Sequence, residues 1–283
     1  MARLLYETHS HTPLCKHAVG QPEEYAAMAE ARGLLGIVIT CHNPMPHGFA
    51  PRVRMSVDEF DEYLEMVAQA RDTWDRRIDV RLGLEADYFA GYELWVENQL
   101  ASSDFHYVLG SVHPQIAEFR QRYGKDDPVE VQRIYFQLLA DAAETGLFDS
   151  MAHPDLIKNE TPNHWRPTQI MDEIRRALDR IAATGVAMEL NTSGVNKAIP
   201  EMNPFPEMLV EIASREIPVV VGADAHVPSR VADRFEQGLD LLCECGFTHV
   251  SYFLDRVRHD VNIEIARASL RDSKLDDPVD VAG

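Results

Sequence analysis

The chain has 283 residues, and 46 Asp and Glu against 27 Lys and Arg give a formal net charge of −19. This charge argues against a general nucleic-acid binder, which needs a basic surface, and no stretch reaches the ~20 apolar residues of a membrane span. Four cysteines do not make a disulfide framework, and charge interrupts the N-terminus before a signal-type apolar region forms. We therefore expect a soluble, cytoplasmic protein with one domain over residues 1–271 and a polar tail over residues 272–283.

Short apolar runs alternate with amphipathic segments along the chain. Several runs are rich in Val and Ile and are too short for helices, which is typical of buried strands in a parallel sheet. The predicted strands cover residues 4–8, 34–41, 80–84, 108–112, 148–152, 186–190 and 217–221.

Helical signals lie between these strands. Residues 56–59 form a capping box, followed by an apolar stripe at helical spacing over residues 60–67. A second stripe, over residues 170–181, precedes Gly185, a typical helix stop. The alternation predicts one βα-repeat domain, and both an open doubly wound sheet and a closed barrel fit it.

Residues that can bind metals stand at the end of one predicted strand after another. Because the carboxyl ends of parallel strands meet at one edge, we expect these side chains to lie together. A single histidine there is usually structural, but independent structural histidines have no reason to share one edge. The candidates are His9, His11, His17, His42, Glu85, Asp87, His113, His153, Asp155, Glu189, Asn191, Asp224 and His226.

The types of these side chains indicate the class of metal. His9 and His11, like Asp224 and His226, are two residues apart, so a strand directs each pair to one face. Imidazole and carboxylate ligands suit Zn, Mn or Fe, and the number of candidates predicts a cluster of two or three divalent ions. Such clusters hold phosphate oxygens and make hydroxide from water. The sequence has no nucleophile elbow, P-loop or dinucleotide-binding turn.

The order of these motifs resembles that of the PHP (polymerase and histidinol phosphatase) superfamily, and within it PHP-type histidinol-phosphatases. The resemblance runs from about Leu5 to near Tyr252, and residues 9–18, 189–194 and 219–226 carry most of the likeness to the phosphatases. The motifs are His9-Ser10-His11-Thr12, His42, Glu85, Gly110-Ser111-Val112-His113, His153-Pro154-Asp155 and Asp224-Ala225-His226.

The resemblance implies a distorted (β/α)7 TIM-like barrel with a trinuclear metal centre. The ligands it implies are His9, His11, Glu85 and Asp224 for one ion, Glu85, His113 and His153 for a second, and His17, His42 and His226 for a third. Glu7 stands where many members have Asp, either orienting a ligand or simply tolerated.

The resemblance also implies the reaction, a metal-dependent phosphomonoesterase acting on L-histidinol phosphate in histidine biosynthesis. Asp155 or a nearby histidine, His17 or His226, is expected to protonate the leaving alkoxide. Many relatives have Arg where this chain has Asn196, which lacks the charged guanidinium fork. Lys158 and Lys197 either supply that charge for the phosphate or are solvated surface residues.

Two other functions stay open. One is a metal-dependent hydrolase that acts on another substrate, such as a phosphodiesterase, an exonuclease or an amidohydrolase-like enzyme. The other is a non-catalytic PHP module. A non-catalytic module is expected to lose ligands, whereas every implied ligand position is filled here. The expected partner is a small phosphorylated metabolite, with no nucleic acid and no membrane, and the oligomeric state stays open.

Overall fold

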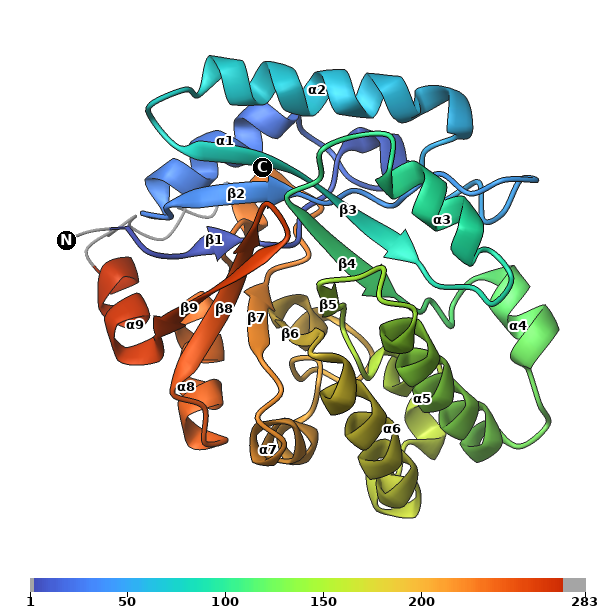
Figure 1. The fold of residues 1–283 in the computed structure, drawn as a ribbon. Coiled ribbons are helices and arrows are strands. Elements are labelled where there is room, and N and C mark those ends of the chain that lie inside the picture. Colours follow the sequence, from blue (N-terminus) through green and yellow to red (C-terminus); the bar gives the residue numbers. More distant parts are fainter. Residues whose placement is uncertain (1–2, 272–283) are drawn as a thin grey trace, which may run out of the picture.

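The computed structural model describes residues 3–271, so the predicted polar tail, residues 272–283, lies outside the described residues. Its centre is a sheet of nine strands in chain order, in which β1 to β8 are parallel and β9 is antiparallel to β8 (Figure 1). The strands are β1 (Tyr6–Glu7), β2 (Gly36–Ile39), β3 (Asp79–Asp87), β4 (Tyr107–Ser111), β5 (Ser150–Met151), β6 (Ala187–Asn191), β7 (Val219–Gly222), β8 (His249–Leu254) and β9 (Val257–Asn262).

A bridge between the first and seventh strands closes the mouth of this sheet. Just beyond β1 and β7, Ser10 pairs in parallel with Ala225. The His11 N–H donates to the Ala225 carbonyl and the Ala225 N–H to the His9 carbonyl, both at 3.0 Å. Strands β1 to β7 therefore surround one mouth, which confirms the predicted α/β fold with a seven-stranded, TIM-like barrel.

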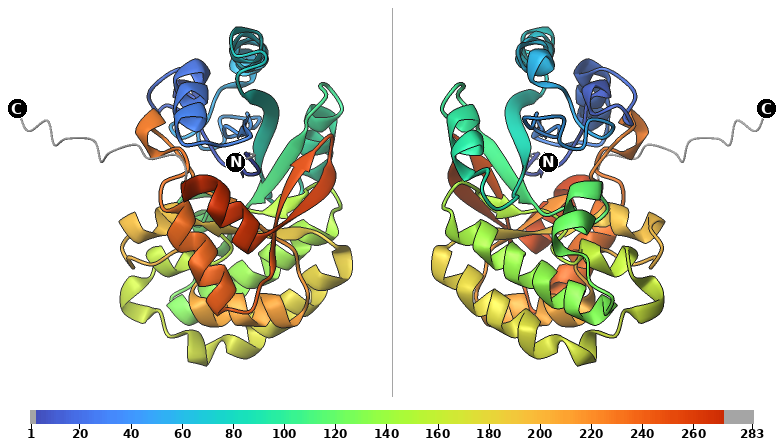
Figure 2. Two further views of the ribbon diagram at one scale, coloured as in Figure 1. Left: turned by 90° about the vertical axis from the view of Figure 1, so that its left-hand side faces the viewer. Right: turned by 90° about the vertical axis from the view of Figure 1, so that its right-hand side faces the viewer.

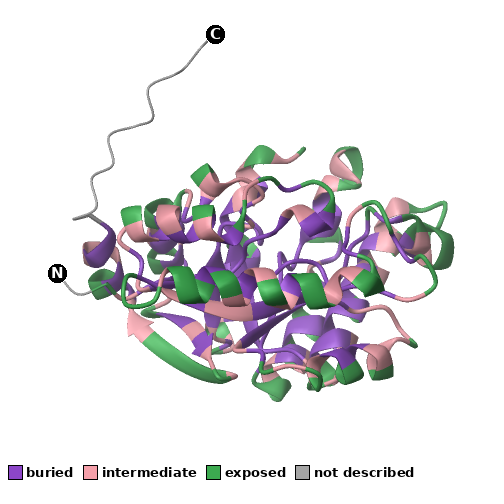
Figure 3. Cartoon of the chain, turned by 90° about the horizontal axis from the view of Figure 1, so that it is seen from above, coloured by how far each residue is buried: buried purple, intermediate pink, exposed green. Residues whose placement is uncertain are grey.

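Helices cover the outside of the strands (Figure 2). Both predicted stripes face the core, with Tyr63 and Val67 of α2 and Ile174 and Leu178 of α6 buried. Burial follows the same pattern, since the outer helix faces are exposed and most of the sheet is buried, apart from an exposed strand at its edge (Figure 3). The helices are α1 (Pro22–Ala31), α2 (Phe60–Thr73), α3 (Glu93–Leu100), α4 (Ala117–Tyr123), α5 (Pro128–Glu144), α6 (Met171–Thr184), α7 (Pro206–Ser214), α8 (Phe235–Glu244) and α9 (Ile263–Arg271). Within residues 3–271, none of them is long and apolar enough to cross a membrane.

The C-terminal hairpin was not among the seven predicted strands. β8 continues the parallel sheet with one residue pair to β7, and β9 returns antiparallel along it. Most of β9 is exposed, with the sequence VRHDVN. A strand exposed in this way carries no apolar run, so the criterion that found the buried strands does not detect it.

Candidate metal centre

The segments that follow the strands deliver the predicted ligands to the mouth. Two of them, His153 (φ 29°) and Asp224 (φ 50°), have left-handed backbone, which non-glycine residues seldom adopt. The His153 N–H donates to a Glu189 carboxylate oxygen at 2.7 Å. Next to Asp224, the Ala223 N–H donates to Glu7 at 2.9 Å. Buried carboxylates therefore hold the backbone on which these two ligands are placed.

Glu85, near the end of β3, is the hub of the cluster. It is fully buried, and five imidazoles reach its two oxygens. On Oε2 the distances are 2.8 Å from His42 Nδ1, 3.4 Å from His9 Nε2 and 3.6 Å from His11 Nε2; on Oε1 they are 3.1 Å from His153 Nε2 and 3.2 Å from His113 Nε2.

A second group lies towards the open side of the mouth. The Nε2 atoms of His17 and His226 are 2.9 Å apart, and the ligand atoms of these two residues and His42 lie within 4.8 Å of one another. Asp224 connects the two groups, because its Oδ1 is 3.1 Å from His11 Nε2 and 3.4 Å from His226 Nδ1. The structure thus brings all nine implied ligands into one continuous cluster.

Unpartnered atoms show that this donor set suits a cation. His9 Nε2, His42 Nδ1 and Glu85 Oε2 are buried and make no hydrogen bond of normal geometry to any residue that the structure describes, although His42 Nδ1 and Glu85 Oε2 lie only 2.8 Å apart. Buried polar atoms normally have partners, and orphans of this kind call for an ion or another ligand. Imidazole nitrogens and carboxylate oxygens that converge in this way fit Zn, Mn or Fe.

The carboxylates control the charge of the cluster in the absence of metal. Burial alone would raise the pKa of Glu85, but His42, His9 and His113 outweigh it and hold that pKa well below its usual range. Burial alone would lower the pKa of His113, but Asp87 and Glu85 raise it to about 9. The metal-free site therefore pairs carboxylates with protonated imidazoles such as His113, whose protons divalent cations can replace, whereas burial lowers the pKa of His42 to about 4 and that of His226 to about 3.

An outer layer of carboxylates orients the cluster. Glu189 lies 2.7 Å from His9 Nδ1, and Asp87 lies 2.8 Å from His113 Nδ1. Arg54 donates to Asp87 at 2.6 Å, and both of these side chains are buried. Glu7 accepts backbone N–H groups, including that of His9 at 3.0 Å, so it fixes the chain of a ligand rather than an imidazole ring.

A cavity of roughly 430 Å³ opens onto the cluster. Asn196 and Lys197, for which we predict substrate contacts, both line it. The Lys197 ammonium is 3.5 Å from Asp224 Oδ2, and the Asn196 amide donates to the Ser193 carbonyl at 3.2 Å. The lining residues are His17, His42, Glu85, His113, Gln115, His153, Leu156, Ser193, Asn196, Lys197, Asp224, His226 and Arg230.

Asp155 and Lys158 do not lie where their predicted roles require. Both side chains are fully buried, they form an ion pair at 2.9 Å, and neither lines the cavity. Asp155 also accepts from the Asn203 side chain and from the Phe205 N–H, while Lys158 donates to the Met202 carbonyl at 2.9 Å. The geometry corrects both predictions, because this pair ties the segment before α7 to the barrel and leaves no donor free for a substrate.

Sequence reasoning missed three polar residues of the lining. Gln115 stands two residues after His113, Ser193 two residues after Asn191, and Arg230 four residues after His226. The signal in the sequence that could have found them is their position, since each lies within four residues of a predicted site residue. Arg230 adds a second cation to the wall, and its guanidinium is 3.1 Å from Asp233.

Comparison with known proteins gives the family and agrees with the fold. A family model described as PHP domain matches residues 7–193. A probable histidinol-phosphatase of Deinococcus radiodurans is 38% identical over 254 residues, 88% of this chain and 96% of that protein, and a histidinol-phosphatase of Bacillus subtilis is 23% identical over 82% of this chain and 97% of that protein. The histidinol phosphate phosphatase of Lactococcus lactis, solved with zinc, L-histidinol and phosphate, has the same fold, with a TM-score of 0.76 at 20% identity over 90% of this chain and 98% of that chain. With its barrel, its ligand cluster and this match over most of its length, the chain belongs to the PHP domain family.

Proposed function

We propose that this protein is a metal-dependent phosphomonoesterase that hydrolyses L-histidinol phosphate to L-histidinol and phosphate in histidine biosynthesis. The observation that carries the proposal is the cluster of nine His, Glu and Asp side chains, seven of which line one cavity. The name of the D. radiodurans relative, which the match covers over 96% of its length, supports the substrate. The proposal keeps the predicted cytoplasmic setting, in which all four cysteines stay free thiols.

The proposed cofactors are two or three divalent ions, Zn, Mn or Fe. When bound, such ions supply positive charge to phosphate oxygens and lower the pKa of water. Glu85 is placed to share ions, because its two oxygens face different imidazoles. The proposed sets are His9, His11, Glu85 and Asp224; Glu85, His113 and His153; and His17, His42 and His226.

Side chains of the cavity wall would hold the rest of the phosphate. Lys197 and Arg230 supply the positive charge that Asn196 lacks, and Gln115 and Ser193 offer neutral hydrogen bonds. Of the three groups predicted to protonate the leaving alkoxide, His17 and His226 line the cavity and Asp155 does not. Both histidines are also proposed ligands of the third ion, so we assign either of them the acid role only in a form of the protein that binds two ions and leaves their Nε2 atoms free.

The test is phosphate release by protein that has been stripped of metal and reloaded with Zn, Mn or Fe. L-histidinol phosphate is compared with p-nitrophenyl phosphate and the diester bis-p-nitrophenyl phosphate, and bound metal is counted in the same samples. We expect metal-dependent hydrolysis with a clear preference for L-histidinol phosphate.

Other outcomes identify the competing functions. Faster turnover of the diester than of either monoester would replace the proposal with a phosphodiesterase. Strong hydrolysis of p-nitrophenyl phosphate with little of L-histidinol phosphate would keep the cluster and reject the substrate, and Asn196 would be the first position to change. Less than one ion per chain, with no rescue by added metal, would favour a non-catalytic module.

A further inference from the structure

Most histidines of the cluster have a partner on the ring nitrogen that faces away from it. Glu189 lies beside Nδ1 of His9, and Asp87 beside Nδ1 of His113. The Nδ1 atoms of His17 and His226 lie 2.7 and 3.0 Å from the backbone carbonyls of Cys15 and Asp224. Partners of this kind fix the tautomer and direct the free lone pair of the other nitrogen towards the metal.

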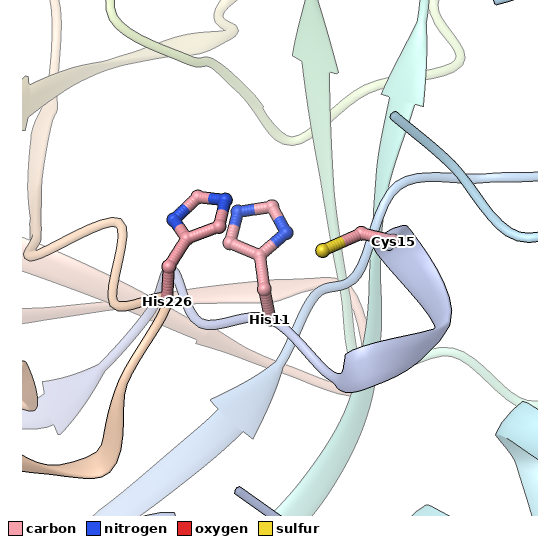
Figure 4. Close-up of side chains that lie close together, drawn as sticks. All are labelled: His11, Cys15 and His226. Carbon is pink, nitrogen blue, oxygen red and sulfur yellow. The ribbon is translucent and has the colours of Figure 1, made fainter. Parts of the chain in front are cut away.

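His11 lacks such an oxygen partner, as does His153, whose Nδ1 is likewise buried without a hydrogen bond to the described residues. Its Nε2 faces the cluster, 3.1 Å from Asp224 Oδ1 and 3.6 Å from Glu85 Oε2. Its Nδ1 is buried and makes no hydrogen bond of normal geometry within the described part of the chain. Figure 4 shows the sulfur of Cys15 beside this nitrogen, with the His11 ring between Cys15 and His226.

Local backbone geometry places Cys15 in this position. Residues Pro13–Cys15 form a short 3₁₀ helix, and Lys16 ends it in the left-handed conformation with φ 71°. The turn leads the chain from His11 back to the mouth at His17 and leaves the Cys15 side chain buried. The same turn presents the Cys15 carbonyl to His17. Cys15 therefore lies beside two proposed ligands, with its backbone carbonyl at His17 and its sulfur next to the His11 ring.

We propose that Cys15 is a positioning residue for the metal centre. Its sulfur accepts a hydrogen bond from Nδ1–H of His11, which leaves the Nε2 lone pair directed at the cation. Sulfur is a weak acceptor, but the thiol is fully buried, so water does not compete for the imidazole N–H. The inference rests on the proposed function, because it assigns a role only if His11 binds metal.

The test measures how tightly the protein holds zinc in competition with a chelator. The variants are Cys15→Ala, which removes the acceptor, Cys15→Ser, which keeps one, and Cys245→Ala as the matched control. Cys245 is also buried, but its thiol contacts the Pro206 carbonyl, away from the cluster. Loss of an outer partner typically weakens metal binding about 10–100-fold, so we expect that loss in Cys15→Ala, a smaller loss in Cys15→Ser and no change in Cys245→Ala.

Three results would overturn the proposal. The first is zinc affinity in Cys15→Ala within about twofold of the wild type, on the scale of that 10–100-fold expectation, and the second is a Cys15→Ser variant no better than Cys15→Ala. The third is a thiolate-to-metal charge-transfer band in the cobalt-substituted wild type that disappears in Cys15→Ser, because it would make Cys15 a ligand. If Cys15→Ala does not fold, Cys15→Ser and the cobalt spectrum decide.

The same measurements separate this inference from the proposed function. Wild-type protein that binds no zinc would overturn both. Wild-type protein that binds zinc and hydrolyses L-histidinol phosphate, with unchanged affinity in Cys15→Ala, would overturn only the role of the thiol.

Discussion

Histidines occur at both ends of the barrel, but their surroundings differ. At the carboxyl end of the strands, five imidazoles converge on the two oxygens of Glu85. At the opposite end and along the hairpin, each histidine has local partners instead. His106 pairs with Asp255 at 2.6 Å, His249 lies beside Thr248, and His259 stacks on Tyr252.

The difference shows what makes a histidine part of a site. His106 meets an exposed carboxylate that water screens. The imidazoles at the mouth face buried carboxylates, where charges interact strongly and unpaired atoms are costly. A histidine therefore becomes part of a cation site where imidazoles and carboxylates converge inside the barrel, and not because of its residue type alone.

Glu85→Gln is expected to give the largest effect at the mouth. The amide removes the charge that five imidazoles share, so bound metal should fall and phosphate release should drop about 10³-fold, since metal ions contribute several kcal/mol to such reactions. Metal content and turnover are measured on the same preparation. The matched control at the other end is His259→Gln, which should change neither.

An equal loss of bound metal and of phosphate release in His259→Gln and Glu85→Gln would remove the distinction between the two ends of the barrel. Full metal content in Glu85→Gln would show that Glu85 is not the hub. Circular dichroism of both variants verifies that the fold is retained.

Asp87→Asn tests the outer layer of the mouth. The substitution weakens the partner of His113 Nδ1, and we expect metal affinity to fall about 10–100-fold. It also leaves Arg54 buried without its charge partner, which should lower the free energy of unfolding by about 3–5 kcal/mol. Chelator competition and urea unfolding measure the two effects separately. Unchanged metal affinity with lowered stability would restrict Asp87 to a structural role.

The sequence predicted that the proposed ligands lie together, because strand ends in a parallel fold share one edge. His42, His113 and His153 each follow a buried apolar run, so their convergence needed no knowledge of side-chain orientation. The barrel closure was different, because the pattern of apolar runs does not encode the bridge between Ser10 and Ala225. The family resemblance, not periodicity, predicted the barrel.

Asp155 shows where alternation along a strand fails. In extended chain, residues two apart point to the same face, so Asp155 was expected to accompany His153 into the mouth. Strand β5 has already ended at Met151, and His153 has left-handed backbone with φ 29°. That turn directs Asp155 into the core, towards Lys158 and Asn203. Sequence periodicity holds only while the backbone stays extended.

Metal loading should depend on pH. Burial alone would lower the pKa of His11, but Asp224, Cys15 and Glu85 raise it to about 9 in the metal-free chain, and His113 has a pKa of about 9 as well. Both imidazoles therefore carry protons at pH 7 and must lose them to bind metal. Metal affinity should rise about tenfold per pH unit for each proton released, up to pH near 9. Calorimetry in buffers of different ionisation enthalpy counts these protons, and zero release would contradict the protonated cluster.

The smallest expected effect on turnover separates two lysines. Lys197 lines the cavity, whereas Lys158 is buried against Asp155. Lys197→Met should reduce phosphate release roughly tenfold, since a charge-assisted hydrogen bond contributes about 1.5–3 kcal/mol and this side chain is partly exposed. The free energy of unfolding of Lys197→Met should hardly change. Lys158→Met should instead lower the free energy of unfolding, because it leaves Asp155 buried and unpaired, while the folded fraction keeps its affinity for phosphate. Thermal unfolding and inhibition by inorganic phosphate are measured on both variants, and weaker phosphate inhibition in folded Lys158→Met would return Lys158 to the substrate site.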